Sequence, residues 1–150
     1  MHRPALLAAL LGLLVCARAR AAEITVVIRG LESSDGNVLV EVFGESQRAA
    51  FPYADRGVTA EIRVQAKALQ QPGKQASVSI GDLAPGSYAV VAIHDANANG
   101  DIDLNMFGIP TEGYGFSNGA RPGLGPPSFD AAAVAVGADA PTRIEITLSH

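Results

Sequence analysis

Oxygen-bearing side chains occupy alternate positions in one short run of this chain, and the run contains a single glycine, Gly100. The alternate positions are Asp95, Asn97, Asn99, Asp101 and Asp103. Carboxylate, amide and carbonyl oxygens at this spacing are the ligands of calcium-binding loops, in which a glycine makes the sharp turn. The run therefore predicts a structural Ca²⁺ site, to which Asp101 contributes its backbone carbonyl and the other four residues their side chains.

The twelfth position of this run does not fit the calcium pattern. Calcium loops carry a bidentate glutamate there, whereas this chain has Met106. Glu112 is the nearest carboxylate after the run, so we expect it to complete the ligand shell. A polar turn is the alternative, in which Asn and Asp side chains bond to nearby backbone and glycine supplies a positive φ.

His94 stands directly before the run and raises the question of catalysis. With Asp103 or Glu112 it could move protons in a small periplasmic hydrolase. No second histidine or cysteine lies nearby to make a zinc or copper site. We favour a histidine that orients the loop through a hydrogen bond to a carbonyl or carboxylate, and we predict no catalytic residue.

The amino terminus has the pattern of a signal peptide. His2 and Arg3 precede an apolar stretch over 5–17, and small residues follow up to Ala22. We predict that residues 1–22 are removed and that the protein is periplasmic or extracellular. Lipidation at Cys16 is the weaker alternative, because valine precedes this cysteine where a small residue is usual.

Charge and cysteine content limit the function of the mature chain. Without residues 1–22 it keeps 8 basic and 15 acidic side chains, a formal net charge of −7, and it loses its one cysteine. An acidic protein is a poor ligand for nucleic acid or anionic lipid. Stability must come from a packed core, strand pairing and the predicted metal site, since no disulfide can form.

Apolar residues alternate with period two along most of the chain, as in half-buried strands. The pattern predicts strands around 24–28, 38–42, 62–64, 78–80, 88–93, 134–136 and 144–148. The stretch 88–93 is apolar on both faces and is expected to be central, and 67–71 is expected to form a short helical turn. About seven strands in 23–150 predict one all-β domain, an antiparallel Greek-key β-sandwich.

Residues 95–130 do not follow this alternating pattern. They contain seven glycines and four prolines and show no apolar periodicity. Apolar residues are nonetheless frequent in the segment, which argues against disorder. They are Ile102, Leu104, Met106, Phe107, Ile109, Tyr114, Phe116, Leu124 and Phe129. We expect an ordered, glycine-rich flap into which these side chains pack, with burial of Tyr114 and Phe116 favoured over their display to a ligand.

Several segments together carry a resemblance to a known family. They are Asp-Leu-Ala-Pro-Gly-Ser-Tyr at 82–88, the polar run after His94, Gly-Ile-Pro-Thr-Glu-Gly-Tyr-Gly-Phe-Ser-Asn at 108–118 and Pro-Pro-Ser-Phe-Asp at 126–130. The mature chain resembles the bacterial family catalogued as domain of unknown function 2141, which implies a secreted bacterial protein without an assigned activity. The turn before Tyr88 is also similar to turns of transthyretin-like and carboxypeptidase regulatory-like sandwiches, a likeness that supports fold alone.

These observations favour a secreted, non-enzymatic binding or structural module of the bacterial cell envelope with a calcium-stabilised loop. Its partner would be a protein or glycan of the envelope. The first alternative is a metal-free module whose flap binds carbohydrate or peptide, which requires exposed aromatic residues and a groove. The second alternative is the hydrolase that uses His94.

Overall fold

A computed structural model describes residues 20–69 and 75–150. Short strands dominate, with a few single-turn helices between them. In chain order the elements are β1 (Ala22–Arg29), β2 (Asn37–Gly44), η1 (Glu45–Gln47), η2 (Ala54–Arg56), β3 (Ala60–Gln65), α1 (Ala66–Leu69), β4 (Gln75–Leu83), β5 (Gly86–Asp95), β6 (Gly113–Phe116), η3 (Ser117–Gly119), α2 (Phe129–Ala132), β7 (Val134–Val136) and β8 (Thr142–Thr147).

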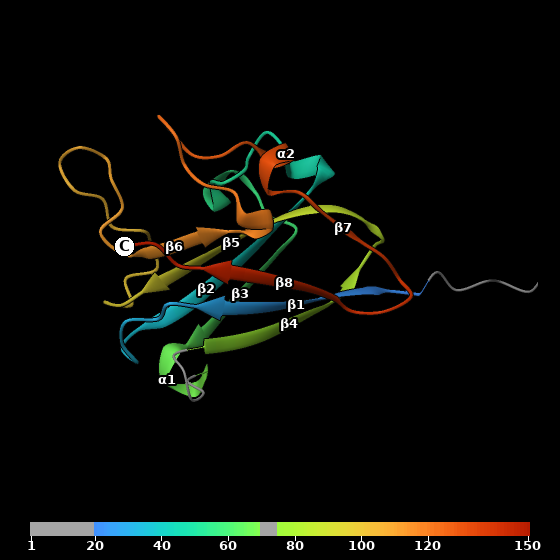
Figure 1. The fold of residues 1–150 in the computed structure, drawn as a ribbon, viewed down its shortest axis with the longest axis horizontal. Coiled ribbons are helices and arrows are strands. Elements are labelled where there is room, and N and C mark those ends of the chain that lie inside the picture. Colours follow the sequence, from blue (N-terminus) through green and yellow to red (C-terminus); the bar gives the residue numbers. More distant parts are fainter. Residues whose placement is uncertain (1–19, 70–74) are drawn as a thin grey trace, which may run out of the picture.

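The strands form two sheets that overlap in Figure 1. The smaller sheet has the order β4-β1-β8, and the larger has the order β3-β2-β5-β6, with β7 paired to one end of β5. All pairs are antiparallel except β1 with β8, which run parallel. The prediction of an all-β sandwich is confirmed, and the parallel pair departs from the purely antiparallel arrangement that we expected.

The main core lies between the sheets and is built from the alternating apolar positions of their inner faces. Val38, Val40 and Val42 of β2 face inward together with Ile24, Val26 and Ile28 of β1, and all six are fully buried. At about 25 cal/mol per Å² of apolar area removed from water, this burial is the main stabilising term of the fold.

A second apolar cluster lies on the outer face of the five-stranded sheet. Val91 and Ile93 of β5 and Phe116 of β6 belong to it, and Phe51 of the loop after η1 and Phe129 of α2 cover part of it. Phe51 makes edge-to-face contacts with both Phe116 and Phe129. Because β5 has apolar neighbours on both faces, its sequence is apolar throughout, and its central position is as predicted.

β6 is the strand that sequence periodicity missed, so the predicted flap contains a strand of the larger sheet. Its inward positions are Gly113 and Gly115, which carry no apolar signal. A Cβ at Gly113 would lie 2.4 Å from the His150 ring, and a Cβ at Gly115 would lie 2.6 Å from Ile146 Cγ2. Glycine is required at Gly115, where the backbone oxygen of Thr147 would also lie 2.7 Å from a Cβ, whereas at Gly113 the obstacle is the His150 side chain.

Two predictions concern residues that lie wholly or partly outside the described part of the chain. The signal segment and Cys16 lie almost entirely outside it, and β1 already begins at Ala22, which pairs with Leu83. The helical turn expected at 67–71 corresponds to α1, and its last two residues lie outside the described residues. Among the helices of residues 20–69 and 75–150, none has the length and apolar character needed to cross a bilayer.

Candidate functional site

The polar base of the flap, residues 95–103 with Glu112, is a closed hydrogen-bonded loop. Asp95 is fully buried, and its two carboxylate oxygens accept the amides of Asn99 at 3.0 Å and Gly100 at 2.9 Å. Glu112 is also buried, and it accepts the amides of Ala96 at 3.0 Å and Asp103 at 3.1 Å. These two carboxylates fasten the start and the end of the loop.

Three further residues of the predicted site converge at the surface of this loop. The side-chain Nδ2 of Asn97 donates to Asp103 Oδ2 at 2.6 Å, and the side-chain Nδ2 of Asn99 donates to Asp103 Oδ1 at 3.0 Å. The Oδ1 atoms of Asn97 and Asn99 accept the backbone amides of Asn99 and Asp101, respectively. Asp101 takes part in these bonds only through its backbone amide, and the residue is exposed.

The loop thus contains several side-chain oxygens that suit a hard cation, but these oxygens already accept hydrogen bonds from within the loop. Each carboxylate oxygen can accept a second partner beside its amide, which leaves room for an ion. For Asn97 and Asn99 to share an ion with Asp103, both side chains would have to turn, because their NH₂ groups and not their oxygens face the Asp103 carboxylate. In residues 20–69 and 75–150 no three His, Cys, Asp or Glu side chains are grouped to hold a metal, so amide and carbonyl oxygens would have to supply much of the shell.

The surroundings hold this loop from two sides. Gly36 packs so closely that a Cβ there would lie 2.0 Å from the Asp95 carbonyl oxygen. Gly100 has a φ of +91°, and the Arg63 guanidinium lies against it, with Nη1 3.2 Å from the position of a Cβ. The positive charge of Arg63 opposes a cation at this point, and both glycines are needed for the approach.

His94 is part of the scaffold in this structure. It lies on the inner face of β5, is 3% exposed, and its Nε2 is 3.0 Å from the carbonyl oxygen of Asp35. This is the carbonyl hydrogen bond that we favoured from the sequence. Both oxygens of Glu112 and both oxygens of Asp103 have other partners, so the hydrolase alternative gains no support from their hydrogen bonds.

The serines of the flap also have structural partners. Ser117 is fully buried, accepts the Val90 amide at 2.8 Å and donates to the Ala132 carbonyl at 2.6 Å. Ser128 caps α2 by accepting the Ala131 amide. Both hydroxyls thus have a structural role, and that of Ser117 has both a donor and an acceptor partner.

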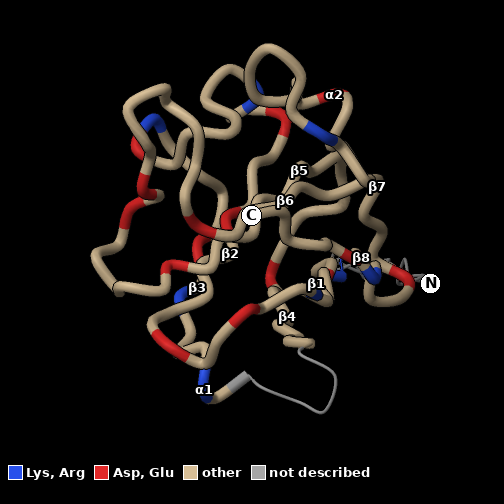
Figure 2. Tube along the Cα trace, turned by 60° about the vertical axis from the view of Figure 1, so that its left-hand side comes forward, with Lys and Arg blue, Asp and Glu red and all other residues tan. Residues whose placement is uncertain are grey.

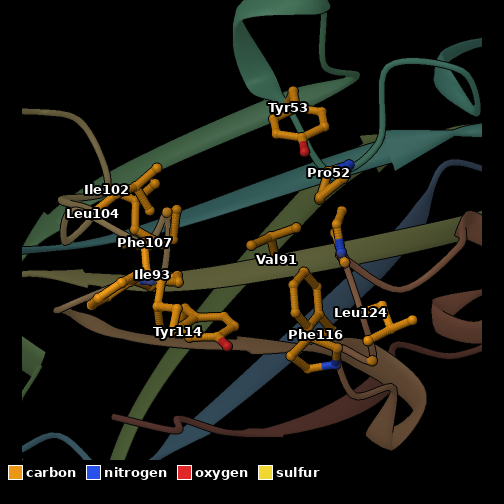
Figure 3. A pocket seen from close by; sticks show the side chains of 17 residues that line it. Pro52, Tyr53, Val91, Ile93, Ile102, Leu104, Phe107, Tyr114, Phe116 and Leu124 are labelled. Atoms are coloured by element: carbon orange, nitrogen blue, oxygen red, sulfur yellow. The ribbon is translucent and has the colours of Figure 1, made fainter.

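An apolar cleft of about 510 Å³ opens between the flap and the outer face of the five-stranded sheet. Figure 3 shows Ile102, Leu104 and Phe107 on one side of it, Leu124 on the other, and Val91 between them. The remaining lining residues are Pro52, Tyr53, Ile93, Gly108, Ile109, Pro110, Tyr114, Phe116, Pro122, Gly123, Gly125 and Pro126. The segments 52–53, 102–110 and 122–126 thus meet over β5 and β6 around a mainly apolar space.

The flap tip, residues 104–110, was expected to bury its apolar side chains, and this expectation is wrong for most of them. Phe107 is 80% exposed, Met106 is 89% exposed, and Leu104 and Ile109 are more than half exposed. Leu124 across the cleft is fully exposed. Phe116 is buried as we favoured, whereas Tyr114 is half-buried and lines the cleft. The tip stands away from the sheet, so its side chains have nothing to pack against.

Glu41 is a buried carboxyl that the sequence analysis overlooked. It is 6% exposed and lies directly across from Val91 of β5, on the same outer face as the cleft floor. Burial, together with the nearby charge of Glu61, raises the pKa of Glu41 to about 7. The available signal was a lone acidic residue inside the apolar run Val38 to Phe43. Figure 2 shows acidic segments gathered on the side of the molecule that carries β3.

The family model described as an uncharacterized protein conserved in bacteria (DUF2141) matches residues 26–145. The chain belongs to this family. The match spans both sheets, the polar base of the flap and the cleft, so these features lie within the family domain. Neither the curated proteins nor the solved structures gave a match.

Proposed function

We propose that this chain is a non-catalytic binding module of the bacterial cell envelope that takes a small apolar ligand in the cleft beneath the flap. The cleft itself is the observation that carries the proposal. Its volume lies in the range of small-molecule sites, about 300–1,000 Å³, and its lining is apolar with few polar groups. An apolar lining favours an aliphatic or aromatic ligand over a sugar, which would need more hydrogen-bonding partners.

The exposure of the flap tip supports the same proposal. Folded proteins rarely leave large apolar side chains grouped in water unless the patch binds something. Leu104, Phe107 and Ile109 are exposed next to one another, and all three line the cleft together with Leu124. A ligand between these side chains and the sheet would remove them from water. The proposed envelope location is supported by the signal-like segment at 1–22 and by the bacterial family.

The cleft is tested with N-phenyl-1-naphthylamine, a neutral dye that fluoresces in apolar sites. We expect saturable binding to the wild type and an affinity about tenfold weaker for Phe107→Ser, because burying one large apolar side chain is worth roughly 1.5–3 kcal/mol. Met106→Ser is the matched control, since Met106 is equally exposed in the same loop but does not line the cleft. Absence of dye binding, or equal losses in both variants, would refute the cleft as a binding site.

A calcium-stabilised flap is a second candidate, and it is compatible with the first. Its support is the convergence of Asn97 and Asn99 on Asp103, with the Glu112 carboxylate bonded to the loop at Ala96 and Asp103. The ion would hold the polar base and thereby position the flap tip over the cleft. Calorimetric titration of chelator-treated protein with CaCl₂ tests this role. We expect a dissociation constant on the order of 0.1–1 mM, and no heat of binding would eliminate the ion.

A further inference from the structure

The flap tip carries apolar side chains that stay largely uncovered. Met106 is 89% exposed and Phe107 is 80% exposed, and Leu104 and Ile109 are more than half exposed. Figure 1 shows the connection between β5 and β6 projecting beyond both sheets. A ligand in the cleft would cover Phe107 from one side, but Met106 does not line the cleft and would stay in water. The exposure of Met106 therefore points to a partner outside the cleft.

Hydrogen bonds within the tip hold it in this exposed shape. The Asn105 side chain accepts the backbone amides of Phe107 at 2.9 Å and Ile109 at 3.1 Å. The Gly108 amide donates to the Asn105 carbonyl at 2.9 Å, and the Asn105 amide donates to the Ile109 carbonyl at 2.8 Å. The tip is thus a closed turn, and these four amides would keep their partners if the turn entered an apolar medium, where an unpaired amide is costly.

Charged residues are almost absent from the flap on both sides of the cleft. In 104–111 and 113–129 Arg121 is the one charged residue, although the mature chain carries a formal net charge of −7. Arg121 is exposed, and within residues 20–69 and 75–150 it has no ion-pair partner. Carboxylates would be repelled by lipid phosphates, whereas an arginine binds phosphate oxygens. A neutral tip with one cation nearby is therefore complementary to a zwitterionic phospholipid surface.

The size of the tip favours a bilayer over a second protein. The tip comprises the seven residues 104–110, whereas a stable protein interface takes about 20–30 residues from each side. Leu124 across the cleft adds one more exposed apolar side chain. A narrow turn with a few large apolar side chains can enter the boundary between headgroups and acyl chains, because lipids adapt to its shape.

We propose that the flap tip inserts into the surface of a zwitterionic phospholipid bilayer, with Met106 and Phe107 among the acyl chains. The driving force is the removal of apolar area from water, at about 25 cal/mol per Å². The inference goes beyond the proposed function, since insertion needs no ligand in the cleft. It places the cleft at the membrane surface, because Phe107 belongs both to the tip and to the lining of the cleft.

Met106→Trp tests insertion with a fluorescent probe at the tip, because the chain has no tryptophan of its own. The exported protein is used, from which the apolar stretch 5–17 is expected to be removed. Vesicles of phosphatidylcholine should shift the emission to the blue, and vesicles of phosphatidylcholine brominated on its acyl chains should quench it. Ala68→Trp is the control, since Ala68 is exposed on α1, which Figure 1 places away from the flap, and its emission should not change.

Two variants at the same position test whether apolar character is what binds the bilayer. Met106→Ser should bind phosphatidylcholine vesicles about tenfold more weakly than the wild type, as for the loss of one large apolar side chain from an apolar contact. Met106→Leu should bind as the wild type does. Flotation of the vesicles in a density gradient measures the bound fraction. Without vesicles, both variants should bind the dye of the cleft as the wild type does, because Met106 does not line the cleft.

The outcomes separate this inference from the proposed function. If the brominated lipid leaves the Met106→Trp emission unchanged, or if Met106→Ser and Met106→Leu float equally, insertion is refuted and the cleft is judged by the dye alone. Self-association that depends on Met106, without binding to vesicles, would refute the bilayer in favour of a second copy. If the vesicles bind the tip but the dye does not bind, the cleft is refuted while insertion stands.

Discussion

The polar base and the tip of the flap differ in whether their side chains have partners within the protein. In the polar base, Asp95, Glu112 and Asp103 each accept two hydrogen bonds within the loop. In the flap tip, Phe107 and Met106 are almost fully exposed. The half whose sequence suggested a site is internally complete, whereas the half whose sequence suggested core filling lacks partners. A motif of polar residues can therefore serve to build a loop, and apolar residues outside the core can mark the binding surface.

Asp95→Ala is expected to give the largest effect, because it removes the carboxylate that holds the start of the loop. Two backbone amides lose their partner at a fully buried position, so the free energy of unfolding should fall by about 3 kcal/mol. Urea denaturation measures the change. Asp101→Ala is the control in the same loop, since it removes the same charge from an exposed side chain, and its effect should stay within about 0.5 kcal/mol. Equal losses in both variants would show that charge, and not the buried bonds, stabilises the loop.

Calcium is expected to act on the same half of the flap. An ion that binds only the folded chain stabilises it by about 2.7 kcal/mol at a hundredfold excess over its dissociation constant. The melting temperature should then rise by roughly 6–15 °C over the chelated form. Asp103→Ala should abolish this rise, because Asp103 is the side chain on which both asparagines converge. The same melting temperature in calcium and in chelator would leave the polar base as a purely hydrogen-bonded turn.

Glu41→Gln is expected to change how stability depends on pH. The folded protein holds the Glu41 proton up to about pH 7, whereas the unfolded chain loses it near pH 4.5. The folded state therefore binds more protons in this window, so the contribution of Glu41 to stability is present below pH 4.5 and is lost as the pH rises to 7. Relative to the wild type, the variant should gain about 2 kcal/mol between pH 5 and pH 8. Urea titrations at both pH values that show a constant difference would contradict the buried, protonated Glu41.

Phe107→Ser is expected to give the smallest effect on stability, in contrast to its effect on dye binding. The side chain is 80% exposed, so its loss should change the free energy of unfolding by less than about 0.5 kcal/mol. Urea denaturation of the variant without ligand makes this measurement. A loss of 2 kcal/mol or more would show that the flap tip packs as part of the core, as the sequence analysis expected.

The sequence by itself determined the class of the fold and most of the strands. Period-two alternation located β3, β4 and β8, because each has one face in the core and one face toward solvent. It also located β1, whose outer face is partly covered, and β2, which is buried on both faces. The sequence also predicted that Glu112 joins the polar run, because it is the nearest carboxylate after that run. The hydrogen bond of His94 to a backbone carbonyl was foreseen for the same local reason.

Only the tertiary structure decided what depends on segments distant in the chain. β6 needs glycine where the opposite sheet approaches it, so its apolar alternation is half missing from the sequence. The cleft is formed where 52–53, 102–110 and 122–126 meet over β5, and no local pattern records that meeting. Glu41 lies between β3 and β5 and is buried by residues that are distant in the chain. Exposure is a property of the packed molecule, and for this reason the sequence could not distinguish the flap tip from a core.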